Sequence, residues 1–222
     1  MNNFFSYEGP FFSVLNRLSD LVILNVLWFV CCLPVFTIGA STTALYYVTI
    51  KIVNDEDAYV AKNFFKSFKE NFIQSTIMWI IMAALGVFIY YDFLFIANNE
   101  AISSNTSLYT GMFSALCFIG LVSLMVLVWI FPLQARLENK IRHTFKNALL
   151  LGFRHLPTTI LLIAILIACL WIAGTFRSIF VIWVVIAVSS VVYGCSFLVD
   201  KIFKLYIKPE DLGVVSDAES EE

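Results

Sequence analysis

The chain has 222 residues, of which 60% are hydrophobic and only 14% are charged, and its formal net charge is −2. An ordinary soluble domain carries roughly 25% charged residues, so this composition excludes a soluble domain. The small net charge gives no reason to expect a nucleic-acid partner. The sequence therefore predicts an all-α, polytopic helical membrane protein.

Five apolar segments are each long enough to cross a hydrocarbon core roughly 30 Å thick, which takes about 20 helical residues. They cover approximately residues 21–50, 76–97, 112–133, 156–176 and 179–199. We expect them to form one integral membrane domain over residues 1–205. Residues 206–222 are acidic and poor in aromatic residues, which predicts a disordered cytoplasmic tail.

The first segment is apolar as far as Leu33 and is then interrupted by Pro34, Gly39 and a group of small hydroxylated residues. One helix over the whole segment would be longer than the membrane core, so it would have to tilt or kink. We expect one kinked helix that crosses the membrane. The alternative is a re-entrant hairpin of two half-helices, whose irregular backbone would have to be buried in protein or line a cavity.

Lys and Arg are concentrated in the connections after the first and third segments and in the tail, which hold twelve of the fourteen basic residues. Cytoplasmic loops carry an excess of these residues. With five spans, this distribution predicts a multi-pass protein of the cell membrane with its N-terminus outside and its C-terminus in the cytoplasm. If the first segment is re-entrant, both termini are cytoplasmic.

Two basic stretches outside the segments have helical periodicity. Residues 57–75 place Phe residues on one face, and Lys62, Lys66 and Lys69 lie off that face. This pattern is typical of a helix that lies in the membrane interface in contact with lipids. The stretch RHTFKNALLLGFRH, residues 142–155, precedes the fourth segment in the same way. We expect both stretches to form interfacial amphipathic helices.

Asp92 is the only carboxylate inside an apolar segment, and such a group is by default a candidate for function. The length of the second segment leaves it at the external interface, where Arg177 is also expected. We therefore expect an external ion pair between Asp92 and Arg177, or a solvated interfacial position for Asp92. A role in moving a substrate or a proton is the alternative.

Small and polar residues inside the apolar segments predict where helices come close, because they allow close backbone approach and interhelical hydrogen bonds. The predicted helix-packing or partner-binding positions are Asn25, Pro34, Thr37, Gly39, Ser41, Thr42, Thr43, Ser190 and Gly194. A substrate groove lined by the same hydroxyl groups is the alternative.

No sequence pattern predicts a catalytic, cofactor or metal site. All five cysteines lie in apolar segments, where they are interpreted as small hydrophobic residues, and the two histidines are too few to build a metal site with them. The chain contains no phosphate-binding loop, no metalloprotease motif and no nucleophile elbow. We expect neither enzymatic activity nor a cofactor.

The stretch RLSDLVILNVLWFVCCLPVFTIGASTTALYYV, followed by NFFKSFKENFIQS, resembles the YesL-like family of small bacterial integral membrane proteins. The portion LPVFTIGASTTALY is the specific part, and the remainder matches mainly in hydropathy. The family is described as a domain of unknown function, and its members tend to be encoded with carbohydrate ABC importers and glycan-degrading enzymes in Gram-positive bacteria.

The resemblance implies a non-enzymatic accessory subunit that binds the permease helices of a carbohydrate ABC importer, and it supplies no catalytic residues. The alternative function is a stand-alone transporter or channel for a small solute. In that case the broken first segment would be a re-entrant element of the transport path.

Overall fold

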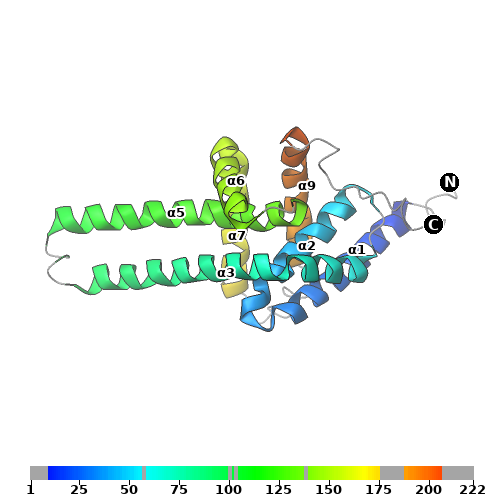
Figure 1. Ribbon diagram of the computed structural model, residues 1–222, viewed down its shortest axis with the longest axis horizontal. Coiled ribbons are helices and arrows are strands. Elements are labelled where there is room, and N and C mark those ends of the chain that lie inside the picture. The colour runs from blue at the N-terminus through cyan, green and yellow to red at the C-terminus, as the bar shows by residue number, and fades with distance from the viewer. Residues whose placement is uncertain are drawn as a thin grey trace.

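The computed structural model describes residues 10–56, 59–99, 102, 105–137, 140–175 and 188–206. Every regular element among these residues is helical, which confirms the all-α prediction (Figure 1). The elements are α1 (Pro10–Cys32), the short 3-10 helix η1 (Val35–Thr37), α2 (Ile38–Val53), α3 (Val60–Asn98), α5 (Thr106–Arg136), α6 (Ile141–Arg154), α7 (Leu156–Thr175) and α9 (Val188–Tyr206).

Four described stretches are long and apolar enough to cross a membrane: Leu15–Cys32, Val35–Val53, Val60–Asn98 and Thr106–Arg136. A fifth arises if α6 and α7, which meet at an angle of 104°, are counted as one broken span. The chain is therefore a helical membrane protein. Part of the predicted last span, residues 179–187, lies outside the described residues, as does the predicted tail from residue 207 onward.

The first apolar segment is a helical hairpin. Helix α1 ends at Cys32, and α2 returns antiparallel to it (Figure 1). Near the turn, Trp28 Nε1 donates to Thr42 Oγ1 at 3.3 Å, and at the open end the Arg17 guanidinium pairs with the Asp55 carboxylate. The structure thus has two antiparallel helices in place of the one kinked helix that was expected over residues 21–50. Each helix is long enough to cross a membrane by itself, so they are not the half-helices of the re-entrant alternative.

The chain reverses between Leu33 and Thr37. Pro34 interrupts the helix there, and backbone carbonyls around the turn accept hydrogen bonds from groups outside the helical ladder. A proline lacks the N–H that would continue the ladder of helical hydrogen bonds. The backbone N–H of Thr37 donates to Pro34 O at 2.8 Å, and its hydroxyl also reaches the carbonyls of Cys31 and Pro34. From α3, Trp79 Nε1 donates to Val35 O at 2.9 Å. The carbonyls of Cys31, Pro34 and Val35 thus have donors within the protein, which is what irregular backbone inside a membrane requires.

Helices α3 and α5 form a long antiparallel pair that extends away from the other helices (Figure 1). The 39 residues of α3 correspond to a length of about 58 Å. The lysine-bearing stretch does not form the separate interfacial helix that was expected, because it is the first part of α3. Its Phe64 is fully buried in one cluster with Leu45 and Val48 of α2, whereas Phe65 is exposed, so protein covers its apolar face only in part.

The second basic stretch is a separate helix, α6, which packs on α5 and joins α7 at the sharp bend. Helices α6, α7 and α9 lie across the direction of the α3–α5 pair in Figure 1. Trp129 of α5 is fully buried beside Phe203 of α9 and donates its indole N–H to Thr159 of α7 at 2.9 Å. This end of α5 is the place where the later helices join the core.

We predict that replacing Gly39 with alanine destabilises the fold. A Cβ at this position would lie 2.7 Å from Trp79 Cβ and even closer to the backbone oxygen of Ser75, so α2 and α3 would have to separate. Overpacking of this kind costs about 1–3 kcal/mol, which unfolding in detergent micelles would measure. Gly194→Ala is the control because a Cβ there meets open space. Equal stability of both variants would contradict the close approach of α2 to α3.

Candidate functional site: a buried ionic cluster at the basic end

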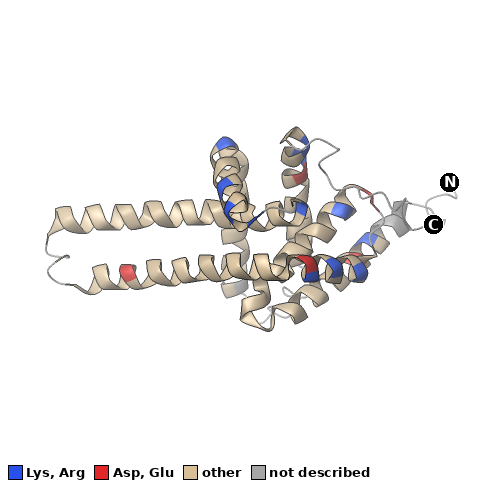
Figure 2. Ribbon diagram, viewed as in Figure 1, with Lys and Arg blue, Asp and Glu red and all other residues tan. Residues whose placement is uncertain are grey.

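Basic side chains gather at one end of the molecule. Figure 2 shows Lys and Arg on α6, on α9, near the end of α2 and on the first turns of α3. The opposite half of the α3–α5 pair is almost without charge in the same view. We call the first of these regions the basic end; it contains Asn54, Arg136 and Asp200.

Asp200 is the centre of the basic end, and it is only 3% exposed. Arg136 Nη2 lies 2.7 Å from Asp200 Oδ1, and Asn54 Nδ2 donates to the same oxygen at 3.0 Å. Lys204 Nζ lies 2.7 Å from Asp200 Oδ2 and donates to Asn54 Oδ1 at 2.7 Å. These four residues, which we call the Asp200 cluster, connect the ends of α2, α5 and α9.

The environment of Asp200 favours its ionised form. Burial alone raises the pKa of this carboxyl, but hydrogen bonds from Lys204, Asn54 and Arg136 and the charge of Lys204 outweigh burial and lower it. Both carboxylate oxygens already accept from these groups, so Asp200 is poorly suited to take a proton from a substrate. The cluster therefore fixes three helices relative to one another.

A second polar cluster connects α3, α5 and α6. Gln134, almost fully buried on α5, donates from Nε2 to Asn71 Oδ1 at 3.0 Å and to Gln74 Oε1 at 2.7 Å, both on α3. Its Oε1 accepts from the hydroxyl of Thr144 on α6 at 3.1 Å. Gln134 thus holds α6 in a fixed position against the α3–α5 pair.

Sequence reasoning missed both clusters because their members are far apart in the chain. One sequence feature is common to Asn54, Arg136 and Asp200. Each lies at or just after the end of an apolar run, next to a stretch rich in Lys and Arg. Polar side chains at the same membrane depth in adjacent helices can meet, but hydropathy does not reveal which helices are adjacent.

Most of the predicted packing residues form contacts inside the chain. The side-chain oxygen of Asn25 accepts from the backbone N–H of Ser189 on α9 at 3.2 Å, and the hydroxyls of Thr43 and Ser75 are 2.9 Å apart. Thr37 lies at the turn, Gly39 and Ser41 are buried, and Thr42 accepts from Trp28. Pro34 and Gly194 are exposed, and Ser190 is half-buried.

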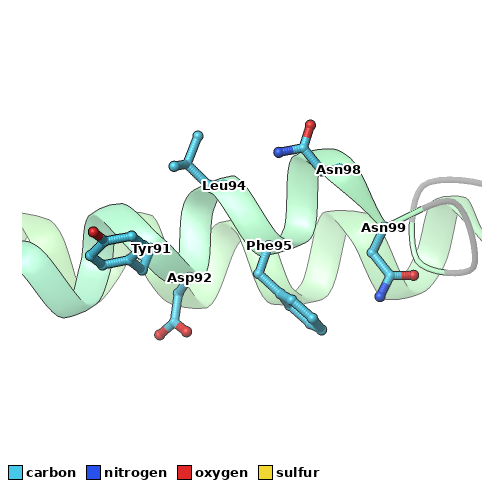
Figure 3. A pocket seen from close by; sticks show the side chains of 6 residues that line it. All are labelled: Tyr91, Asp92, Leu94, Phe95, Asn98 and Asn99. Atoms are coloured by element: carbon cyan, nitrogen blue, oxygen red, sulfur yellow. The ribbon is translucent and has the colours of Figure 1, made fainter.

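Asp92 lies beside an open depression of about 730 Å³ near the far end of α3. Figure 3 shows Asp92, Phe95 and Asn99 on one side of the helix. All six lining residues belong to the last part of α3 or directly follow it, so the depression does not enclose a solute. Arg177 lies outside the described residues, and the ion pair with Asp92 stays a prediction.

Metal binding has no support from the described residues, since no group of three or more His, Cys, Asp or Glu side chains among them could hold an ion. The expected interfacial lysines, Lys62, Lys66 and Lys69, are exposed along the first part of α3. In the part of the chain that the structure describes, the buried polar side chains that contact one another most extensively are those of the Asp200 cluster and of the cluster around Gln134, which join helices.

We predict that Asp200→Asn lowers the free energy of unfolding by about 3–5 kcal/mol, because it leaves the mostly buried Arg136 without its counter-charge. Lys204→Gln should cost at most about 1 kcal/mol, since the lysine side chain is 58% exposed. Titration with a denaturing detergent measures both. If Lys204→Gln were less stable than Asp200→Asn, Asp200 would not be the central residue of the cluster.

The Asp200 cluster also predicts how stability depends on pH. The pKa of the Asp200 carboxyl is lower in the folded state than in the unfolded state. Its contribution to the free energy of unfolding is therefore complete above the unfolded pKa of 3.8 and is lost as the pH falls toward the folded pKa. The stability advantage of the unmodified chain over Asp200→Asn should therefore shrink only below about pH 4. An advantage that disappeared between pH 8 and pH 5 would assign the effect to another group.

Comparison with known proteins gives a family match over part of the chain and relatives without a described activity. Residues 21–93 match the family model "Protein of unknown function, DUF624". The chain is 30% identical over 148 residues to the uncharacterized protein YteU of Bacillus subtilis (strain 168), covering 65% of this chain and 64% of YteU. It is 25% identical over 148 residues to the uncharacterized protein YesL of the same strain, covering 65% of this chain and 67% of YesL.

These matches extend over about two thirds of each chain, and for YteU slightly less than two thirds of its length. No solved structure matches the chain. The matched residues 21–93 contain the α1–α2 hairpin and most of α3, which is also the part that carries the resemblance in the sequence. The predicted resemblance to YesL-like proteins is therefore confirmed over this part of the chain.

Proposed function

We propose that this chain is a non-enzymatic accessory subunit of a carbohydrate ABC uptake system and that it binds permease helices within the membrane. The link to sugar import comes from the family resemblance. The structural observation that supports a helix-binding role is the uncovered surface of α7.

Helix α7 is apolar along its length and is covered by the rest of the described chain at only a few positions. Thr159 and Leu162 are buried, whereas Leu170 and Trp171 are 66% and 68% exposed. Small residues at Ala164 and Ala168 are also exposed, and they lie one turn apart on the same face. Small residues at this spacing let a second helix approach closely in lipid.

The proposed contact surface differs from the one expected at Pro34–Thr43. Gly39 and Thr43 already pack against α3, so these small residues serve the fold of this chain. The transporter alternative has less support. Trp79 and Thr37 hydrogen-bond to the backbone at the turn of the hairpin, and the depression beside Asp92 is too open to enclose a solute. Helix α7 is therefore the better surface for a partner.

The test is purification of the tagged full chain from its native membrane in mild detergent. A permease pair of constant stoichiometry should accompany the unmodified chain, and Ala164→Leu with Ala168→Leu should reduce its recovery at least about tenfold. Ala84→Leu with Ala115→Leu, at exposed positions of α3 and α5, is the matched control. Recovery of an isolated oligomer that moves solute into liposomes would instead support the transporter alternative.

We also propose that both termini lie in the cytoplasm of a cell-membrane protein. The hairpin brings Arg17 next to Asp55, so the start of α1 lies on the same side as the end of α2. Asn54 in turn lies at the Asp200 cluster beside the end of α9. Since Lys and Arg mark cytoplasmic loops, the basic end should face the cytoplasm.

Labelling in intact cells tests this orientation. In a cysteine-free background, a membrane-impermeant maleimide should label Asn105→Cys, at the start of α5, without lysis. It should label Asn16→Cys on α1 only after lysis. Labelling of both positions in intact cells would restore the arrangement with the N-terminus outside.

A further inference from the structure

We propose that the outer face of α6 is a binding site for the headgroups of anionic phospholipids. This face consists of Arg142, Lys146, Leu149, Leu150 and Phe153, which recur at intervals of three and four residues along one side of the helix. All five are exposed. The proposal does not depend on the role as an importer subunit.

The opposite face of α6 is fixed to the protein. Thr144, Ala148 and Gly152 are buried, Thr144 donates to Gln134, and a Cβ at Gly152 would lie 3.3 Å from Met125 Cε. The outer face is therefore held in one orientation before any lipid binds. A site that is already ordered loses little conformational entropy on binding.

The charged and the apolar residues of the outer face occupy different halves of α6. Arg142 and Lys146 occupy its first half, and Leu149, Leu150 and Phe153 occupy the half that leads to α7. Because α6 lies across the direction of the α3–α5 pair, α6 would lie along the membrane surface when that pair crosses the membrane (Figure 1). The apolar half then contacts acyl chains while the two cations reach lipid phosphates.

The bend itself is held by contacts that keep α6 in place. His155 Nε2 lies 2.8 Å from Tyr206 Oη of α9, and the Arg154 guanidinium lies 4.8 Å from the centre of the same ring. The angle between α6 and α7 is thus supported from a third helix. The lysines of α3 lack this arrangement, since Lys66 and Lys69 are close in sequence to Glu70 on a helix that continues without a break to Asn98.

Lipid retention tests the proposal. The purified full chain is mixed with detergent micelles that contain equal amounts of dioleoyl phosphatidylglycerol and dioleoyl phosphatidylcholine, repurified, and its bound lipids are quantified by mass spectrometry. The unmodified chain should retain phosphatidylglycerol preferentially. Arg142→Gln with Lys146→Gln should lower that preference by about fivefold for each charge removed, and Arg142→Lys should keep it.

Lys62→Gln with Lys66→Gln is the matched control, because it removes the same charge from exposed positions of α3. It should leave the lipid preference unchanged, and unaltered thermal unfolding of both double variants would show that they fold. The proposal is overturned if the α6 variant keeps its preference or if both variants lose it equally. It is also overturned if the preference arises only after removal of residues 207–222, since the acidic tail would then occupy this face.

Discussion

The fold depends on how the backbone is satisfied at the break in its first apolar segment. A carbonyl without a donor costs several kcal/mol in hydrocarbon, so a chain can reverse there only if other groups replace the lost helical hydrogen bonds. Thr37 supplies donors from within the turn, and Trp79 supplies one from α3. Because these donors are present, α2 can return along α1 and bring Asp55 back to Arg17.

The position of α2 then determines where the polar residues of the other helices can meet. Lying between α1, α3 and α9, it places Thr43 beside Ser75 and Thr49 beside Ser196 at 2.8 Å. At its end, Asn54 reaches Asp200. Single hydrogen bonds between membrane helices contribute modestly, about 0.6 kcal/mol on average, so the mostly buried Arg136–Asp200 pair is the contact whose disruption should matter most.

The sequence was sufficient for the helical class and the position of the break, because both depend on local composition. It could not decide between a kinked helix and a hairpin, since Pro34 and Gly39 suit both. That choice depends on Trp79, which lies 44 residues from its acceptor Val35. The Asp200 cluster was missed for the same reason, because its contacts join residues up to 150 positions apart.

The distribution of polar contacts also restricts how a partner could bind. Within the described residues, most buried polar side chains bond inside the chain, while the exposed faces of α7 and of the far half of the α3–α5 pair are largely apolar. Apolar faces gain little from leaving lipid, because the acyl chains are equally apolar. A stable contact there must come from close packing, and Ala164 and Ala168 permit it where Leu170 and Trp171 project farther. Selectivity for a partner helix would therefore depend on its shape rather than on its charge.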